Sequence, residues 1–316
     1  MQTRSFRFVL AALTLALVLA GMPGPISAQD GGALDANLTD SCADSYDPDL
    51  NYFPEQVAFE YAGGVTVEYF NNYKLVTVTE PWDGATEADA FQYVLVQCGT
   101  PAPEDVPAGA LVLDVPVATV MTMSTTQLPH FAVLGILGRL TGVDQITYVS
   151  DPDVIARYAA GDIIEIGYGA AVNVELVLDA EPNLVMAYGL GSPESDAHPV
   201  LREAGVPFAM NAEHAENSPL GRAEWLKFTA LFFNQEGAAN DIFADIAADY
   251  EALAALTADI PAAARPSLLP NTFSPWTEAW SIPGASSYAG QLYADAGAAL
   301  VLSGDPAVDE ADYSVL

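Results

Sequence analysis

Histidines and short runs of hydroxyl, amide and carboxylate side chains are the residues of this sequence whose types could do chemistry. His130, His198 and His214 are the only histidines among 316 residues, so acid–base catalysis and zinc binding have few candidates. The sequence has no G-x-S-x-G, H-E-x-x-H or G-x-x-x-x-G-K-[ST] motif, and Gly189-Leu190-Gly191 lacks the third glycine of a dinucleotide-binding fingerprint. We therefore expect a ligand-binding site rather than an enzyme, with no metal ion and no cofactor of its own.

The candidate binding residues follow predicted strands. Open parallel sheets bind ligands in the loops at the carboxyl ends of their strands. These residues are Ser124, Thr125, Thr126 and His130 after the first strand, Tyr188 after the third, and Asn211, Glu213 and His214 after the fourth. Hydroxyls that precede Pro129 would also make an ordinary helix N-cap, so both roles stay open for residues 124–126.

Two tryptophans in a proline-rich loop could form the facing wall of the site. Trp276 and Trp280 lie in the segment 273–280, and together with Tyr188 and His130 they would make an aromatic cleft suited to a bulky, partly apolar ligand. The alternative is that these tryptophans fill a hydrophobic core.

The elements that must position these residues alternate between strands and helices from residue 111 onward. Apolar runs predict strands at 117–123, 145–148, 183–187 and 207–210, separated by helices at 128–140, 152–159, 174–178 and 198–204. This alternation is typical of a parallel sheet covered by helices. We therefore predict an N-terminal α/β ligand-binding lobe over residues 111–237.

The segments on either side complete the predicted fold, which is two α/β lobes with mainly parallel sheets joined by one long helix. Before the first lobe, residues 29–110 hold a mobile lead-in and a small β-rich module with strands at 65–70, 75–79 and 91–96. After it, an amphipathic pattern over 238–256 predicts an interlobe helix within residues 238–258. Residues 259–316 are too few for a full second lobe, so we expect a partial C-terminal α/β lobe that is truncated, with a natural half-lobe as the alternative.

Composition and charge limit the classes of partner. Hydrophobic residues make up 51% and charged residues 16%, which is typical of a folded chain. Nine Lys and Arg residues against 42 Asp and Glu residues give a net charge of −33, which repels polyanions. Nucleic acid is therefore not an expected partner, and we interpret the acidity as a source of solubility.

The N-terminus has the pattern of a secretory signal peptide. Arg4 and Arg7 precede an apolar run over 8–20, and a small residue, Ala28, ends the segment. The run is shorter than the roughly 20 residues that span a bilayer. Leu19-Ala20-Gly21 is similar to the start of a lipoprotein signal, but position 22 is Met rather than Cys. We expect a signal peptide over residues 1–28, cleavage near Ala28, and a soluble monomer in the periplasm or outside the cell.

The cysteine count points to one disulfide. Cys42 and Cys98 are the only cysteines, and no C-x-x-C motif is present. An even pair in an exported chain most simply forms a disulfide, which we predict for Cys42–Cys98.

Several short segments resemble a known family. Val172-Asn173-Val174-Glu175, Leu184-Val185-Met186-Ala187-Tyr188-Gly189 and Pro219-Leu220-Gly221-Arg222-Ala223-Glu224-Trp225 are similar to stretches of periplasmic substrate-binding proteins for iron complexes and cobalamin. The resemblance covers the chain from about residue 111 and implies two α/β lobes, a single long linking helix, and a ligand between the lobes. It implies a receptor that binds a ferric siderophore or similar metal chelate and delivers it to an ABC transporter permease.

The resemblance also implies a docking residue. In relatives, one surface Glu in each lobe pairs with Arg residues of the permease, and Glu175 is at the matching position of the first lobe. Ser286 stands where the second lobe would have its Glu. Glu175 could equally be a solvated acid that favours a helix N-terminus.

Two alternatives to this receptor remain open. A receptor for a bare metal ion could use His130, His214 and Glu213 as ligands. A secreted serine hydrolase, which is a different class of protein, would need a contact between Ser124 and His130.

Overall fold

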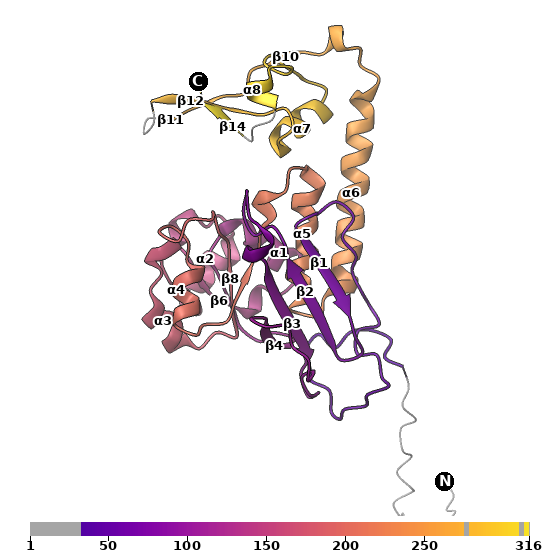
Figure 1. Cartoon of the computed structure of the whole chain (residues 1–316), viewed down its shortest axis with the longest axis vertical. Coiled ribbons are helices and arrows are strands. Elements are labelled where there is room, and N and C mark those ends of the chain that lie inside the picture. Colours follow the sequence, from indigo (N-terminus) through magenta and orange to yellow (C-terminus); the bar gives the residue numbers. More distant parts are fainter. Residues whose placement is uncertain (1–32, 275–277, 310–312, 316) are drawn as a thin grey trace, which may run out of the picture. The chain divides into compact units, whose positions relative to one another are not determined.

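The computed structural model describes residues 33–274, 278–309 and 313–315 (Figure 1). The predicted signal peptide, its cleavage site and Trp276 lie outside the described residues. Within the described part, no helix is both long and apolar enough to cross a membrane.

The first sheet has four strands in the order β1-β2-β3-β4: β1 Val65–Tyr69, β2 Tyr73–Val78, β3 Phe91–Gln97 and β4 Leu111–Val115. The first two pairings are antiparallel and the β3–β4 pairing is parallel. Buried and half-buried residues alternate along β2, as the period-2 pattern predicts. Residue 111, where we expected the α/β lobe to begin, instead starts the last strand of this sheet.

The second sheet is fully parallel and has the order β7-β6-β5-β8-β9. Its strands are β5 Val120–Thr122, β6 Leu140–Val143, β7 Ile164–Glu165, β8 Leu184–Ala187 and β9 Phe208–Met210. The α-helices between them are α1 Leu128–Val133, α2 Pro152–Ala160, α3 Val174–Ala180 and α4 His198–Glu203. The predicted mixed α/β class with a parallel sheet is confirmed.

One predicted strand and one predicted helix boundary are wrong. The segment 145–148 contains a 3-10 helix, Ile146–Tyr148, and the strand of the sheet is β6, which the sequence analysis had assigned partly to a helix. The preceding helix ends early because Gly135 has a φ of 70°, a left-handed conformation that glycine adopts readily. Tyr148 is 69% exposed, so the apolar run there does not mark burial.

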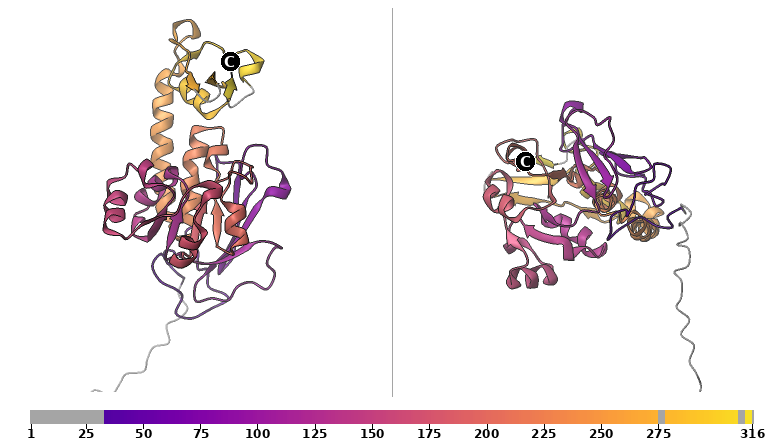
Figure 2. Two further views of the ribbon diagram at one scale, coloured as in Figure 1. Left: turned by 90° about the vertical axis from the view of Figure 1, so that its left-hand side faces the viewer. Right: turned by 90° about the horizontal axis from the view of Figure 1, so that it is seen from below.

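Two consecutive helices follow the second sheet: α5 Pro219–Leu231 and α6 Glu236–Ala258. The long helix predicted from the amphipathic pattern is confirmed, and Figure 2 shows it as one continuous rod between the elements that precede and follow it. The C-terminal strands form a parallel pair, β10 Ser267–Leu268 with β13 Ala299–Leu300, and an antiparallel sheet of β11 Thr272–Ser274, β12 Ala279–Pro283 and β14 Tyr313–Val315. The helices there are α7 Tyr288–Asp295 and α8 Pro306–Asp309.

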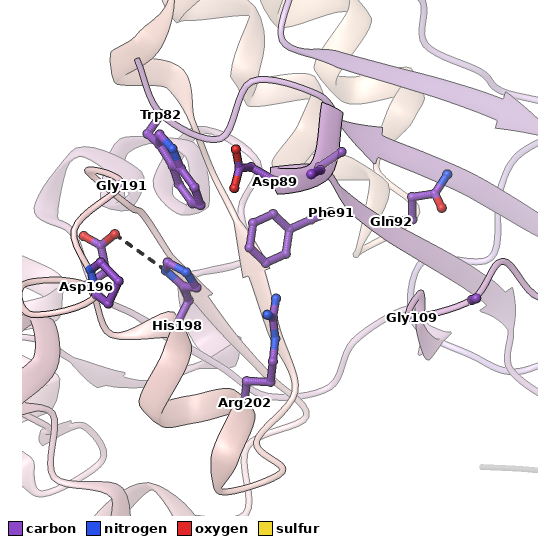
Figure 3. Close-up of a pocket in the computed structure, with 13 residues that line it drawn as sticks. Trp82, Asp89, Phe91, Gln92, Gly109, Gly191, Asp196, His198 and Arg202 are labelled. Carbon is purple, nitrogen blue, oxygen red and sulfur yellow. Dashed lines mark ion pairs between the residues drawn. The ribbon is translucent and has the colours of Figure 1, made fainter. Parts of the chain in front are cut away.

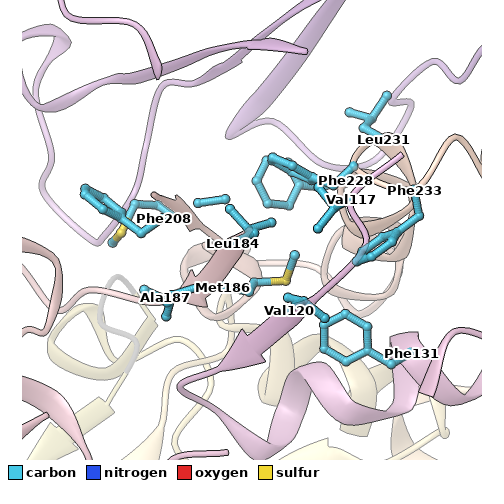
Figure 4. Close-up of a cluster of buried hydrophobic side chains, with 14 of the residues drawn as sticks. Val117, Val120, Phe131, Leu184, Met186, Ala187, Phe208, Phe228, Leu231 and Phe233 are labelled. Carbon is cyan, nitrogen blue, oxygen red and sulfur yellow. The ribbon is translucent and has the colours of Figure 1, made fainter. Parts of the chain in front are cut away.

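A single hydrophobic core connects the two sheets of the first region. Figure 4 shows side chains from β5, β8, β9 and α5 meeting in this core, among them Leu184, Phe208 and Phe228. The core also includes Tyr93 of β3, whose hydroxyl accepts a hydrogen bond from the backbone N–H of Met210 at 2.8 Å. The β-rich module therefore packs directly against the edge strand β9 of the parallel sheet.

Buried carboxylates fasten this module to α5 and α6. Lys74 of β2 and Glu236 of α6 form a fully buried ion pair at 2.6 Å. Glu224 of α5 accepts hydrogen bonds from the backbone N–H groups of residues 60–62 and from Lys227 Nζ. Burial alone would raise the pKa of Glu224, but these hydrogen bonds together hold that pKa below its usual value. Glu216, just before α5, accepts from the backbone N–H groups of residues 63 and 64.

The segment before the first sheet is anchored rather than mobile, which corrects our expectation for its described part. The predicted Cys42–Cys98 disulfide is present. Asn37 is buried, and its side-chain N–H donates to Glu236 Oε2 at 2.9 Å. Because these contacts satisfy buried polar groups, turn-forming composition did not mean mobility here.

Candidate functional site

The site begins where β5 ends. Ser124 caps the 3-10 helix Thr125–Gln127, since its hydroxyl accepts from the backbone N–H of Thr126, and it also lies 2.8 Å from the Thr126 hydroxyl. The capping role left open for this run is therefore real. Thr125 is half-buried and Thr126 is exposed, so hydroxyl groups line the start of the loop that leads into α1.

Helix α1 and the segment after β9 approach each other at His130 and Glu213. His130 Nδ1 lies 2.9 Å from the hydroxyl of Thr229, and His130 Nε2 lies 3.9 Å from Glu213 Oε2. Burial lowers the pKa of His130 to about 4, so the imidazole is neutral at pH 7. Burial raises the pKa of Glu213, while a hydrogen bond from Thr126 and the charge of Arg222 oppose that rise.

The loops after β8 and β9 meet through His214. His214 Nε2 lies 2.9 Å from the carbonyl oxygen of Gly189, and the His214 ring lies edge-on to Tyr188 with 6.1 Å between centroids. Burial lowers the pKa of His214. Asn211 is only 1% exposed and its Oδ1 accepts from the backbone N–H of Glu213, so it shapes this loop from within.

Trp82, which was not among the residues predicted from sequence, holds the loop after β8. A Cβ atom added at Gly191 would lie 2.8 Å from the Trp82 indole, and one added at Gly189 would lie 3.0 Å from it. The indole therefore packs directly on the backbone of the Gly189–Gly191 loop. These two glycines, dismissed as a nucleotide motif, were the signal that another group approaches the backbone closely.

Asp144 was also missed. It directly follows β6, at the same edge of the sheet as the other loops. Its Oδ1 atom is buried without a hydrogen-bond partner, and burial raises the pKa of this carboxyl. The negative charge of Asp144 contributes to raising the pKa of Tyr188, which places the two side chains within electrostatic reach. The misassigned strand at 145–148 hid this residue, because a residue that follows a strand is recognised only when that strand is placed correctly.

The other residues predicted from sequence lie away from these loops, on β12, on α3 and just before α7. Trp280 of β12 is 47% exposed and packs on Phe273 with 5.2 Å between ring centroids. Glu175 is exposed in the first turn of α3, a helix capped by the side chain of Asn173. Ser286 is exposed just before α7.

The geometry gives no support to the two alternatives. Ser124 contacts Thr126 while His130 contacts Thr229, so neither side chain faces the other as a hydrolase requires. His214 Nε2 is occupied by the Gly189 carbonyl. Among the described residues, no group of three or more His, Cys, Asp or Glu side chains is arranged to hold a metal ion.

Arg222 brings a positive charge close to the site. Its Nε donates to the carbonyl of Glu216 and its Nη2 to the carbonyl of His214. Its guanidinium also lies 3.6 Å from the centroid of the Tyr288 ring of α7. Arg222 therefore links the loop after β9 to the C-terminal elements.

The sequence identifies the class of protein. A sequence model of the Periplasmic binding protein family matches residues 120–314, which is more than half of the chain, and the chain belongs to this family. The match begins at β5 and includes all the loops described above.

Individual relatives have low sequence identity to this chain. Two uncharacterized lipoproteins of Methanocaldococcus jannaschii are similar to this chain. The first is 29% identical over 141 residues, which cover 42% of this chain and 33% of the relative. The second is 26% identical over 176 residues, which cover 53% of this chain and 43% of the relative. The chain thus spans less than half the length of these curated relatives.

Among solved structures, an ABC transporter substrate-binding protein from Listeria monocytogenes is 16% identical with a TM-score of 0.49, over 63% of this chain and 69% of that one. The periplasmic heme binding protein HutB of Vibrio cholerae is 18% identical with a TM-score of 0.48, over the same shares.

Proposed function

We propose that this protein is an extracytoplasmic solute receptor that binds a ferric siderophore or similar metal chelate between two lobes and delivers it to an ABC importer. The observation that carries the proposal is the convergence of segments at the carboxyl edge of the parallel sheet, where His130 and Glu213 lie 3.9 Å apart and His214 contacts the carbonyl of Gly189. The family match supports a receptor. The name of one solved relative, the heme binding protein HutB, supports a metal chelate.

The proposed site combines one accessible aromatic ring with a few polar groups. Tyr188 supplies apolar area, the hydroxyl of Thr126 is exposed, and Asp144 and Glu213 supply carboxylates. Such a mixture suits a bulky ligand that is held by contact area and oriented by few hydrogen bonds. Trp276 and Trp280 are proposed to complete the site from the C-terminal elements.

The charge of the site favours a neutral or cationic chelate over a catecholate. Burying an anion beside Asp144 and Glu213 costs several kcal/mol per unpaired charge. Among the described residues, Arg222 is the basic side chain whose charge acts on Glu213 and His214, and two backbone carbonyls accept its N–H groups. A ferric hydroxamate or a corrinoid therefore fits better than a tris-catecholate complex of about three negative charges.

The test is a titration of the full-length protein with a ferric hydroxamate and a ferric tris-catecholate at moderate salt, followed by tryptophan fluorescence. We expect the hydroxamate complex to bind more tightly, and Tyr188→Ala to weaken its binding by roughly tenfold. Tyr148→Ala is the matched control, since Tyr148 is 69% exposed on the 3-10 helix after β6. Tighter catecholate binding would refute the charge argument. Equal affinities in both tyrosine variants would move the ligand away from this edge.

The proposed contribution of the C-terminal tryptophans to the chelate site is tested separately. Trp280→Ala and Trp276→Ala should each weaken binding, and unchanged affinity in both variants would exclude these tryptophans from the ligand site.

Permease docking is proposed to use Glu175. Glu175→Gln should lower uptake of the labelled chelate by cells of the source organism while leaving chelate affinity unchanged. Glu181→Gln, which changes another exposed acid at the end of α3, is the control. Equal uptake by both variants would leave Glu175 as a helix-terminal acid.

A further inference from the structure

A cavity lies on the Trp82 side of the loop after β8, away from His130, Tyr188, Glu213 and His214. It has a volume of about 580 Å³ and lies between the β2–β3 connection, the start of β3, the loop after β8, and α4 (Figure 3). An adjoining cavity of about 290 Å³ continues it along β4 and β9 and shares Phe91, Gln92 and Arg202 with it. None of the residues assigned to the proposed chelate site lines either cavity.

Arg202 projects from α4 into this groove without a polar partner. Its guanidinium carbon lies 5.2 Å from the centroid of Phe91 and 5.7 Å from that of Phe208. It makes no hydrogen bond or ion pair with any described residue. The other described basic side chains, which are Lys74, Arg139, Arg157, Arg222, Lys227 and Arg265, each donate to a carboxylate or to backbone carbonyls. An exposed arginine without a partner is the exception in a chain with 42 acidic residues.

The groove has an aromatic wall beside this cation. The rings of Trp82 and His198 are stacked with 5.4 Å between centroids, and Phe91 meets His198 edge-on at 5.6 Å. Figure 3 shows these three rings facing one another above Arg202. A flat apolar group could extend this stack, because aromatic rings favour offset or edge contacts with one another.

The acidic side chains of the groove already have donors of their own. Asp89 accepts hydrogen bonds from the backbone N–H and the hydroxyl of Thr86. Asp196 accepts from the backbone N–H groups of Leu190 and Ser192 and lies 3.8 Å from His198 Nδ1. Arg202 therefore keeps its donors available in a planar fork, and His198 Nδ1 is also buried without a hydrogen-bond partner.

We propose that this groove is a second binding site, which takes a small carboxylate with a flat apolar body. The Arg202 guanidinium would bind the carboxylate in a bidentate pair, and the Trp82–His198–Phe91 wall would contact the apolar body. The volume falls in the usual range for small-molecule sites. A single negative charge suits the groove better than a phosphate dianion, because the charge of the whole protein repels anions. The proposal does not depend on the proposed chelate site.

The probe is 2-naphthoate, with 2-naphthamide as its neutral counterpart of the same shape, titrated calorimetrically into the full-length protein. We expect the acid to bind about tenfold more tightly than the amide, because a charge-assisted pair replaces a neutral hydrogen bond. Arg202→Gln should abolish this preference, and Arg202→Lys should retain part of it. Arg265→Gln, which removes one positive charge elsewhere, should leave the preference unchanged.

Thermal unfolding of each variant checks the fold, and Arg202 is exposed, so its replacement should leave the melting temperature unchanged. Equal binding of acid and amide would overturn the proposal. So would the absence of saturable binding by either probe, or a preference for the acid that persists in Arg202→Gln.

Discussion

The region up to Phe243 and the region beyond it differ sharply in how they use hydrophobic residues. Before α6, apolar side chains from both sheets and from α5 form one buried core. Beyond Phe243, the buried hydrophobic residues of the described part are Ile282 and Val308. The same stretch has large apolar side chains that are exposed: Leu253, Leu256, Leu269, Phe273, Trp280, Leu292 and Val301. Similar apolar composition therefore gives a core in one region and mainly surface in the other.

The C-terminal elements are held to the rest mainly by polar and ring contacts. Tyr250 of α6 donates to Asp295 at the end of α7, and Gln291 of α7 donates to the carbonyl of Asn217. The stability of the chain therefore resides mainly in the first region, and substitutions in that region should cost more unfolding free energy than substitutions after it.

Replacing Lys74, the fully buried cation, should cause the largest loss of unfolding free energy. Lys74→Met leaves Glu236 charged and fully buried without its partner, which typically costs about 3–5 kcal/mol of unfolding free energy. Urea unfolding measures this loss. The double variant Lys74→Met/Glu236→Gln should recover part of the stability, and a single-variant loss below about 1 kcal/mol would contradict the role of the pair.

Removing the disulfide should destabilise the first region by up to about 4 kcal/mol, given the separation of 56 residues between Cys42 and Cys98. The measurement is thermal unfolding of the Cys42→Ala/Cys98→Ala variant beside the oxidised protein. Alkylation of the unreduced, denatured protein should label neither cysteine, and labelling of both would show that the bond does not form.

Acid should destabilise the first region through His130. The pKa of His130 falls from 6.5 to about 4 on folding, so the unfolded chain binds more protons between these values. The stabilising contribution of neutral His130 to the unfolding free energy is complete above pH 6.5. It is lost as the pH falls to about 4, which amounts to roughly 3 kcal/mol. Urea unfolding across this range should show a shallower pH dependence for His130→Gln. Identical slopes would mean that His130 is equally protonated in both states.

The smallest effect is expected in the exposed part of α6. Leu256 is 75% exposed, so Leu256→Ala should change the unfolding free energy by less than about 0.5 kcal/mol. Leu231 of α5 is fully buried, and Leu231→Ala should cost about 2–5 kcal/mol. Similar losses in the two variants would erase the contrast between the regions.

Local sequence patterns predicted most helices and strands, but they could not predict contacts between residues that are distant in sequence. Alternation was sufficient for β1 to β3, and the step of three and four residues was sufficient for α6. The pairing of Cys42 with Cys98 followed from their number together with the expected export of the chain. The position of β6 was missed because its four residues contain Gly142, against which Met121 packs, and so lack a continuous apolar run.

For the candidate site, too, the sequence predicted which residues follow strands but not the contacts between distant segments. His130, Tyr188, Glu213 and His214 follow strands of one parallel sheet, so their shared edge could be inferred from strand order. Trp82 could not be placed, since its contact with Gly189 and Gly191 joins segments more than a hundred residues apart in sequence. The carboxylates of Glu216, Glu224 and Glu236 were counted as solubilising charge, because a sequence does not show which acids have buried donors.

Those carboxylates also have a consequence for chemical modification of the protein. Carbodiimide coupling converts accessible carboxylates to amides, and Glu224 and Glu236 have fully buried side chains that the reagent cannot reach in the folded chain. Mass spectrometry after exhaustive coupling should therefore find both residues unreacted. Charge-reduced derivatives of this protein can therefore be prepared with the contacts of Glu224 and Glu236 intact.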